Sequence, residues 1–147
     1  MLIGGGNYCL AQETAYKTLS FPDDNKANNE TQVYTEKWTA KIGDFSWEIA
    51  NFSNYNWGWT HIRAGRKDYA SVATIDNSTP FDKAIGKIVV DVEKDVDENL
   101  VNSICLQVAS DAKFSDPIET VELKSYKKGD FVFMVSAPQA NKYYRCL

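Results

Sequence analysis

The sequence predicts an all-β protein, an antiparallel β-sandwich or jelly roll of about nine or ten strands. Three observations support this fold class. Apolar and polar residues alternate along many short segments, and Gly, Pro, Asn and Asp residues separate these segments. No stretch of helical length shows a 3.6-residue apolar period. With 147 residues, of which 44% are hydrophobic, the chain can bury one core, and no repeat or linker divides it.

In the first half of the chain, the clearest strand is 45–49, where Phe45, Trp47 and Ile49 alternate with polar residues. Trp47 is therefore expected in the core, and Trp38 with it. The other strands expected in this half are 16–21, 33–42, 59–64 and 69–75. The last two flank a Gly-Arg-Lys-Asp turn, which predicts a β-hairpin.

The second half has a more regular alternation. A loop is expected at 76–80, followed by a short helical turn at 81–85. Isoleucine, leucine and valine then recur at every second position of 87–93 and of 104–108, which predicts two half-buried strands. The strands expected in this half are 87–93, 101–109, 118–123, 130–136 and 143–147.

The two ends of the chain are unusual. Residues 1–12 contain no charged side chain, and Cys9-Leu10-Ala11 precedes a possible cleavage point at Gln12. We interpret 1–12 as the end of a secretion signal, with a disordered Gly-rich leader as the alternative, and 13–147 as one β-sandwich module. The last strand, 143–147, ends without a turn, which favours a polypeptide shortened at both ends and an unpaired edge there.

Three cysteines are present. Removal of the leader would remove Cys9 and leave Cys105 and Cys146 in an oxidising compartment, where two thiols can pair. They lie in different predicted strands, so the sequence leaves the pairing open.

The most distinctive region lies between residues 38 and 59, which hold all four tryptophans. Aromatic rings alternate with Asn, Ser and Gly in 51–60, a combination typical of sugar-binding surfaces and also of core aromatics beside polar turns. The candidate ligand-binding residues are Tyr55, Trp57, Trp59, His61 and Arg63.

The direction of one strand decides between these alternatives. Trp59, His61 and Arg63 share one face of the strand expected at 59–64, and Ile62 lies on the other. If Ile62 faces the core, the three side chains form an outward stripe beside the aromatic loop.

Other kinds of chemistry are not supported by the sequence. The net charge of −4 and the absence of a dense Lys/Arg cluster argue against nucleic-acid binding. No apolar run approaches the roughly 20 residues of a membrane-spanning helix. One histidine and no CxxC motif argue against a zinc site, and no catalytic motif is present, so we expect no enzyme, no catalytic residue and no cofactor.

Two acidic stretches are candidates for calcium ligands. The stretch 95–99 starts like a calcium loop, but its sixth position is Leu100 where the motif needs glycine, which favours a solvated turn. A structural Ca²⁺ at 23–25 is left open. Asn-x-Ser/Thr sequons occur at Asn29, Asn51 and Asn77.

Several segments together resemble one type of module. They are 16–25, 38–52, 59–67, 70–75, 101–104, 108–111 and 140–145. They resemble the uncharacterised β-sandwich, carbohydrate-binding-module-like accessory modules of secreted Bacteroidetes-type bacterial proteins, some of them attached to nuclease or other hydrolase domains. The resemblance covers 16–145 and implies a secreted or cell-surface location without a catalytic motif. Such modules continue beyond the Tyr-Tyr-basic step, where this chain stops.

Two functions follow as hypotheses. The first is a non-catalytic secreted accessory module that binds carbohydrate through the surface around 55–63. The second is a structural or protein-interaction module that packs against a neighbouring domain and has no ligand of its own.

Overall fold

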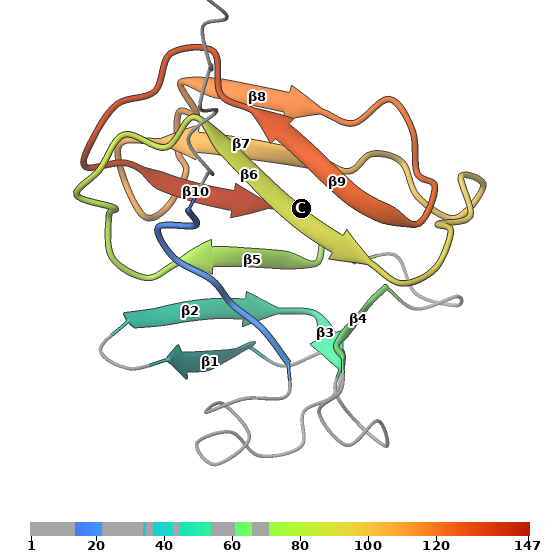
Figure 1. The fold of residues 1–147 in the computed structure, drawn as a ribbon. Helices are drawn as coiled ribbons and strands as arrows, with labels where there is room; N and C mark the ends of the chain where they lie inside the picture. The colour runs from blue at the N-terminus through green and yellow to red at the C-terminus, as the bar shows by residue number, and fades with distance from the viewer. Residues whose placement is uncertain (1–13, 22–33, 35–36, 43–44, 54–60, 66–70) are drawn as a thin grey trace, which may run out of the picture.

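The computed structural model describes most of the chain. The described residues are 14–21, 34, 37–42, 45–53, 61–65 and 71–147. They form ten β-strands and no helix (Figure 1). Every strand pairing among them is antiparallel, and the sheets do not close into a barrel. The predicted all-β, sandwich-like class is confirmed.

The strands are short, as the sequence predicts. In chain order they are β1 (Lys37–Ile42), β2 (Phe45–Ala50), β3 (Phe52–Ser53), β4 (Arg63–Ala64), β5 (Thr74–Asn77), β6 (Lys87–Val92), β7 (Cys105–Ala109), β8 (Glu119–Glu122), β9 (Gly129–Met134) and β10 (Tyr143–Cys146).

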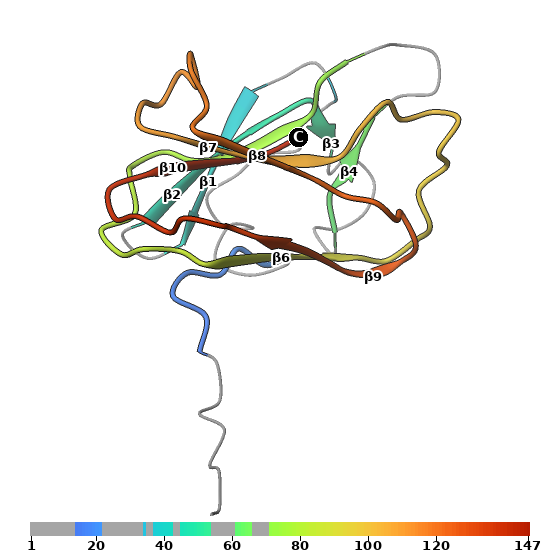
Figure 2. The same cartoon turned by 90° about the horizontal axis from the view of Figure 1, so that it is seen from above.

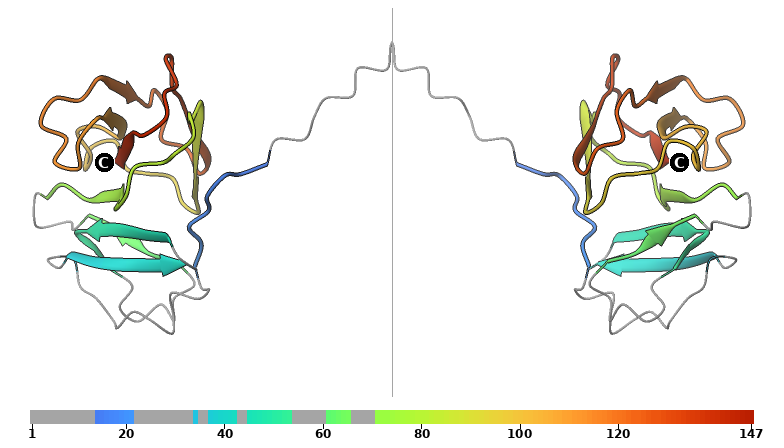
Figure 3. Two further views of the ribbon diagram at one scale, coloured as in Figure 1. Left: turned by 90° about the vertical axis from the view of Figure 1, so that its left-hand side faces the viewer. Right: turned by 90° about the vertical axis from the view of Figure 1, so that its right-hand side faces the viewer.

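The strands lie in two layers of unequal width. One layer is a six-stranded sheet with the order β1-β2-β5-β10-β7-β8. The other contains the pair β6–β9, which lies across one face of the six-stranded sheet (Figure 2). The segment 14–21 lies on the same side of the wide sheet as β6 (Figures 2 and 3). The short pair β3–β4 lies at the end of this arrangement (Figure 1).

The main core fills the space between the two layers. Its buried members are Phe81, Leu106, Val108, Phe131, Phe133, Val135 and Tyr144. Ile88, Val90 and Val92 of β6 face this core, as do Leu106 and Val108 of β7. The alternation predicted for 87–93 and 104–108 is therefore confirmed. Burial of these side chains is the main contribution that holds the layers together.

A second cluster lies at the other end of the wide sheet. Trp38, Ala40 and Ile49 form it, and the segment 14–21 packs against it through Leu19. Trp47 packs against both clusters and connects them. The predicted core positions of Trp38 and Trp47 are confirmed.

Some predicted elements are wrong. Residues 16–21 form no strand, although Leu19 and Phe21 pack against the second cluster. Alternation reports which side chains are buried, whereas a strand also needs a neighbouring backbone to bond with. Residues 81–85 form no helical turn, and Phe81 is instead a core residue joined to Lys142 by an isolated β-bridge.

The hairpin predicted for 59–75 is also wrong. β4 pairs with β3, whereas β5 pairs with β2 and β10. Strand β5 continues through Asn77, where a loop was expected, because Asp76 and Asn77 find partners on β10. Local turn residues favour a hairpin, but these long-range partners decide the pairing.

The last strand also differs from expectation. An edge position was predicted for 143–147, yet β10 lies inside the wide sheet and pairs with β5 on one side and β7 on the other. A side chain supports one of these contacts, since Asn77 accepts a 2.6 Å hydrogen bond from the Tyr144 N–H.

Candidate functional site

The predicted ligand-binding residues are only partly within the described chain. Tyr55, Trp57 and Trp59 lie outside the described residues. His61 and Arg63 are described, and Arg63 is exposed on β4, whereas His61 is half-buried.

The Ile62 side chain faces the core, which is the condition for an outward-facing Arg63 in the strand expected at 59–64. Ile62 packs against the cluster of Trp38, Ala40 and Ile49, so its side chain points inward. Arg63 is exposed as its neighbour, because successive side chains of an extended segment alternate in direction. The pairing of Ser53 with Arg63 fixes the segment beside β3.

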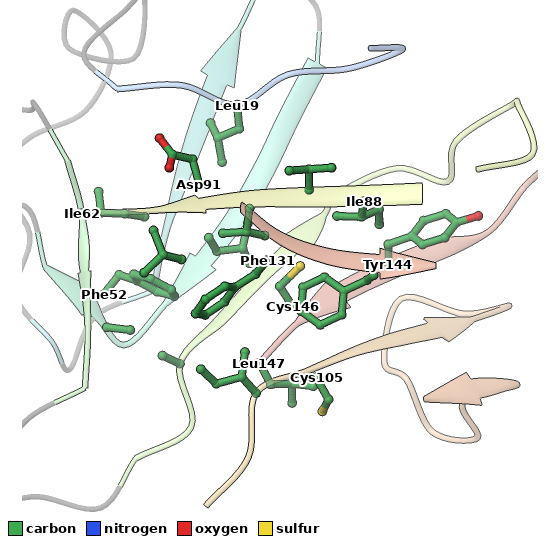
Figure 4. A pocket seen from close by; sticks show the side chains of 18 of the residues that line it. Leu19, Phe52, Ile62, Ile88, Asp91, Cys105, Phe131, Tyr144, Cys146 and Leu147 are labelled. Carbon is green, nitrogen blue, oxygen red and sulfur yellow. The ribbon is translucent and has the colours of Figure 1, made fainter. Parts of the chain in front are cut away.

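These residues border a large cleft between the layers. The cleft has a volume of about 2250 Å³ and lies between β6, the segment 14–21, the β3–β4 pair and the wide sheet. Figure 4 shows Leu19, Phe52, Ile62, Phe131 and Cys146 around this space. Its wall is therefore mainly apolar, although water reaches it from outside.

Charged side chains surround the cleft unevenly. The wall formed by the segment 14–21 and β4 carries Lys17 and Arg63. The end of β6 and the turn after it carry Asp91, Asp95 and Asp97, with Glu93 and Lys94 between them. One end of the cleft is therefore acidic.

Strand β6 presents one backbone edge to the cleft. All residues from Ala84 to Asp97 line the cleft, whichever face of the strand their side chains occupy. Strand β9 pairs with the other edge, and within the described part of the chain no strand pairs with the edge facing the cleft (Figure 1).

The alternation of hydrogen-bonded and non-hydrogen-bonded residue pairs between β6 and β9 identifies the backbone N–H and C=O groups on that edge. Val135 donates a 2.9 Å hydrogen bond to the Gly86 carbonyl, which makes this opposed pair a hydrogen-bonded one. Hydrogen-bonded and non-hydrogen-bonded pairs alternate in an antiparallel ladder. Ile88 and Val90 therefore bond to β9, and the N–H and C=O groups of Val89 and Asp91 point into the cleft.

The two C-terminal cysteines do not form a disulfide. Leu147 and Cys105 exchange backbone hydrogen bonds of 2.9 and 3.0 Å, so they are directly opposed, and Cys146 points to the other face of the sheet. Both thiols are free, and Figure 4 shows their sulfur atoms pointing in opposite directions. Burial, followed by the charge of Asp76, raises the pKa of Cys146 to about 12. Burial, followed by the charge of Glu122, raises the pKa of Cys105.

The acidic stretch 95–99 forms a self-bonded turn. Asp97 accepts hydrogen bonds of 3.0 Å from the backbone and side-chain nitrogens of Asn99. Asp95 accepts a 2.8 Å bond from the Lys128 N–H, which lowers its pKa, with Lys127 adding to the effect. In the described part of the chain, no three His, Cys, Asp or Glu side chains lie close enough together to hold a metal ion. The possible calcium ligands at 23–25 lie outside the described residues.

Sequence patterns identified part of this region. The segment around His61 and Arg63 was predicted as a site, and both residues line the cleft. The cleft itself was not predicted, because the alternation of 87–93 shows which side chains are buried and not which edge of the strand is paired. No sequence signal marks an open edge in this strand.

No protein-family model, curated protein or solved structure matches this chain. Among the described residues, no helix is long and apolar enough to cross a membrane.

Proposed function

We propose that this chain is a non-catalytic accessory module, secreted or displayed on a cell surface, which binds carbohydrate through the surface around 55–63. The observation that carries this proposal is the inward direction of Ile62, because it leaves Arg63 exposed. In the sequence, Arg63 follows closely on Tyr55, Trp57 and Trp59. The resemblance to carbohydrate-binding-module-like accessory modules supports the same ligand class.

The chemistry of these side chains suits a sugar. Aromatic rings offer flat apolar faces to the C–H groups of a pyranose, and a guanidinium group donates hydrogen bonds in a fixed plane to its hydroxyls. His61 supplies a further donor or acceptor at the border of the cleft.

Glycan binding can be measured directly on an array of plant, mucin and bacterial polysaccharides, with affinity gel electrophoresis of the positive ligands. We expect binding, and we expect Trp57→Ala to weaken it by about tenfold or more, since an anchor aromatic contributes roughly 2 kcal/mol. Arg63→Ala should also weaken it, whereas Lys124→Ala, an exposed turn residue far along the chain, is the matched control. Circular dichroism must show that each variant is folded. An array without any bound glycan would contradict the proposal.

A second candidate is a protein-interaction module. The observation that favours it is a contiguous apolar strip on the outer face of the β6–β9 pair. Val89 and Val132 are opposed and 46% and 44% exposed, and Met134 beside them is 60% exposed. Exposed apolar strips of this kind are typical of surfaces that another protein covers.

Met134 provides the test of this second candidate. Dilute peroxide should oxidise Met134 rapidly in the isolated chain, because its sulfur is accessible. In the protein as isolated from its natural source, a covering partner should slow this oxidation, as read by mass spectrometry. Equal oxidation rates in the two samples would argue against a partner on this face.

A further inference from the structure

We infer that the cleft beside β6 accepts one extended strand from a partner protein, which pairs with the open backbone edge of β6 and completes the narrow layer. The inference rests on the protein-interaction candidate but uses a different surface from the strip of Val89, Val132 and Met134.

The first argument is the direction of the backbone groups. The N–H and C=O groups of Val89 and Asp91 point into the cleft, as the hydrogen-bonded pair of Gly86 and Val135 requires. A strand added at this edge would continue the hydrogen-bond ladder of β6–β9. Peptide recognition by strand addition uses groups of this kind for affinity.

The second argument is size. At about 2250 Å³, the cleft exceeds the roughly 300–1,000 Å³ typical of small-molecule sites. It follows the whole length of β6, whose 6 residues span about 20 Å at ~3.3 Å per residue. A polypeptide strand matches this length, whereas a single small ligand would leave much of the apolar wall in contact with water.

The third argument is the division between apolar and polar surroundings. A strand beside β6 would direct alternate side chains into the cleft, whose wall contains Phe52, Ile62, Phe131 and Cys146 (Figure 4). Its other side chains would point to solvent. We therefore expect alternating apolar and polar residues in the partner segment.

The fourth argument is charge. Asp91, Glu93, Asp95 and Asp97 line the end of the cleft where β6 ends. The bases near them are Lys94 and Lys127, whose ammonium lies 3.7 Å from the Asp95 carboxylate, so the acidic groups are in excess. An antiparallel partner strand would begin at this end. We therefore expect Lys or Arg residues at the N-terminal end of the partner strand, where they would lie near the acidic side chains.

Amide hydrogen exchange of the 147-residue chain tests the inference. The probe is a synthetic peptide as long as β6, with alternating isoleucine and threonine after an N-terminal Lys-Lys pair. Without the peptide, the Val89 and Asp91 amides should exchange much faster than those of Ile88 and Val90, which bond to β9. With the peptide at ten times its dissociation constant, exchange at Val89 and Asp91 should slow by about tenfold.

Three controls separate pairing from mere apolar contact. A peptide N-methylated at alternate residues, so that it cannot donate to β6, should not bind. A peptide with Glu-Glu in place of Lys-Lys should bind more weakly. The variant Val89→Pro removes one donor at an edge position where proline is tolerated, and it should lose the peptide but stay folded. If this variant does not fold, the N-methylated peptide decides the question.

Several results would overturn the inference. Slow exchange at Val89 and Asp91 in the free chain would show that the edge is already occupied. Equal binding of the N-methylated peptide, or no binding of any peptide, would show that the cleft does not accept a strand. The oxidation of Met134 reports on the outer face of the β6–β9 pair, so its outcome is independent of this one. The glycan site shares Arg63 with the cleft, but exchange at Val89 and Asp91 reports on the edge of β6 alone.

Discussion

At the scale of single residues, Asn77 shows how a polar side chain can fix the sheet. It is 2% exposed, and its side-chain nitrogen donates to the carbonyls of Thr79 at 2.8 Å and Lys142 at 3.3 Å. Its side-chain oxygen accepts the Tyr144 N–H at 2.6 Å. A glycan cannot be attached to this sequon in the folded chain, because the acceptor nitrogen is enclosed and already bonded.

Asn77→Ala should therefore destabilise the protein. Removal of the amide leaves the Tyr144 N–H and two carbonyls without this partner, at a cost of about 2–3 kcal/mol in the free energy of unfolding. Urea denaturation followed by circular dichroism measures this change. Asn99→Ala, which removes only the side-chain hydrogen bond from Asn99 to Asp97 within an exposed turn, should cost much less. Equal losses for the two variants would refute the role assigned to Asn77.

The raised pKa of Cys146 gives a second residue-scale prediction. Burial raises this pKa from 9.0 to about 12, so the folded chain keeps a proton that the unfolded chain loses above about pH 9. Stability from this group is complete below pH 9 and falls as pH rises toward 12. Unfolding free energies measured between pH 8 and about pH 11 should decrease, and Cys146→Ala should make the decrease shallower. Cys105 and Tyr144, whose pKa values burial also raises, add to the remaining slope.

At the scale of elements, one ion pair connects β5, β10 and the loop before β8. Arg145 donates to both carboxylate oxygens of Asp76, at 2.9 and 2.7 Å, and its guanidinium carbon lies 4.0 Å from the centre of the Phe114 ring. Phe114 has a φ of 56° and is 7% exposed, so the loop folds over the pair. Such a planar, two-pronged contact with an aromatic stack favours arginine over lysine.

Arg145→Lys should thus destabilise the chain although it keeps the charge. A lysine loses one hydrogen bond to Asp76 and the planar stack on Phe114, which together contribute about 1–2 kcal/mol. Thermal unfolding gives the measurement. The contrast is Lys37→Met, which breaks the 2.6 Å pair with Glu48 on exposed side chains and should change stability by less than about 0.5 kcal/mol. A similar shift in both variants would contradict the importance of the arginine geometry.

Sequence patterns predicted the strands better than their partners. The strands at 45–49, 87–93 and 130–136 were predicted correctly because their alternation comes from a buried face. The hairpin at 59–75 failed because β5 pairs with β2 and β10, which are distant in sequence. The candidate site was predicted only in part, because alternation gives side-chain direction and not strand pairing. The direction of the Ile62 side chain follows from alternation, whereas the open edge of β6 depends on which strands pair.

At the scale of the whole molecule, the wide sheet joins two apolar clusters of different size. The main core includes Phe133, which is 1% exposed, and the second cluster includes Ile49, which is fully buried. Trp47 packs against both, and the hydrogen bonds of β2, β5 and β10 run between them without interruption. This continuity favours a single cooperative unit.

The position of the tryptophans makes this cooperativity measurable. Trp38 belongs to the second cluster and Trp47 packs against it. Tryptophan fluorescence therefore reports on that cluster, whereas circular dichroism reports on all strands. We expect urea curves from the two signals to coincide. Phe133→Ala and Ile49→Ala should each move both curves together, by about 3–5 and 2–5 kcal/mol, because each leaves a cavity in a shared unit. If Ile49→Ala shifts the fluorescence curve alone, the second cluster unfolds independently, and the contact of Trp47 with both clusters does not couple them.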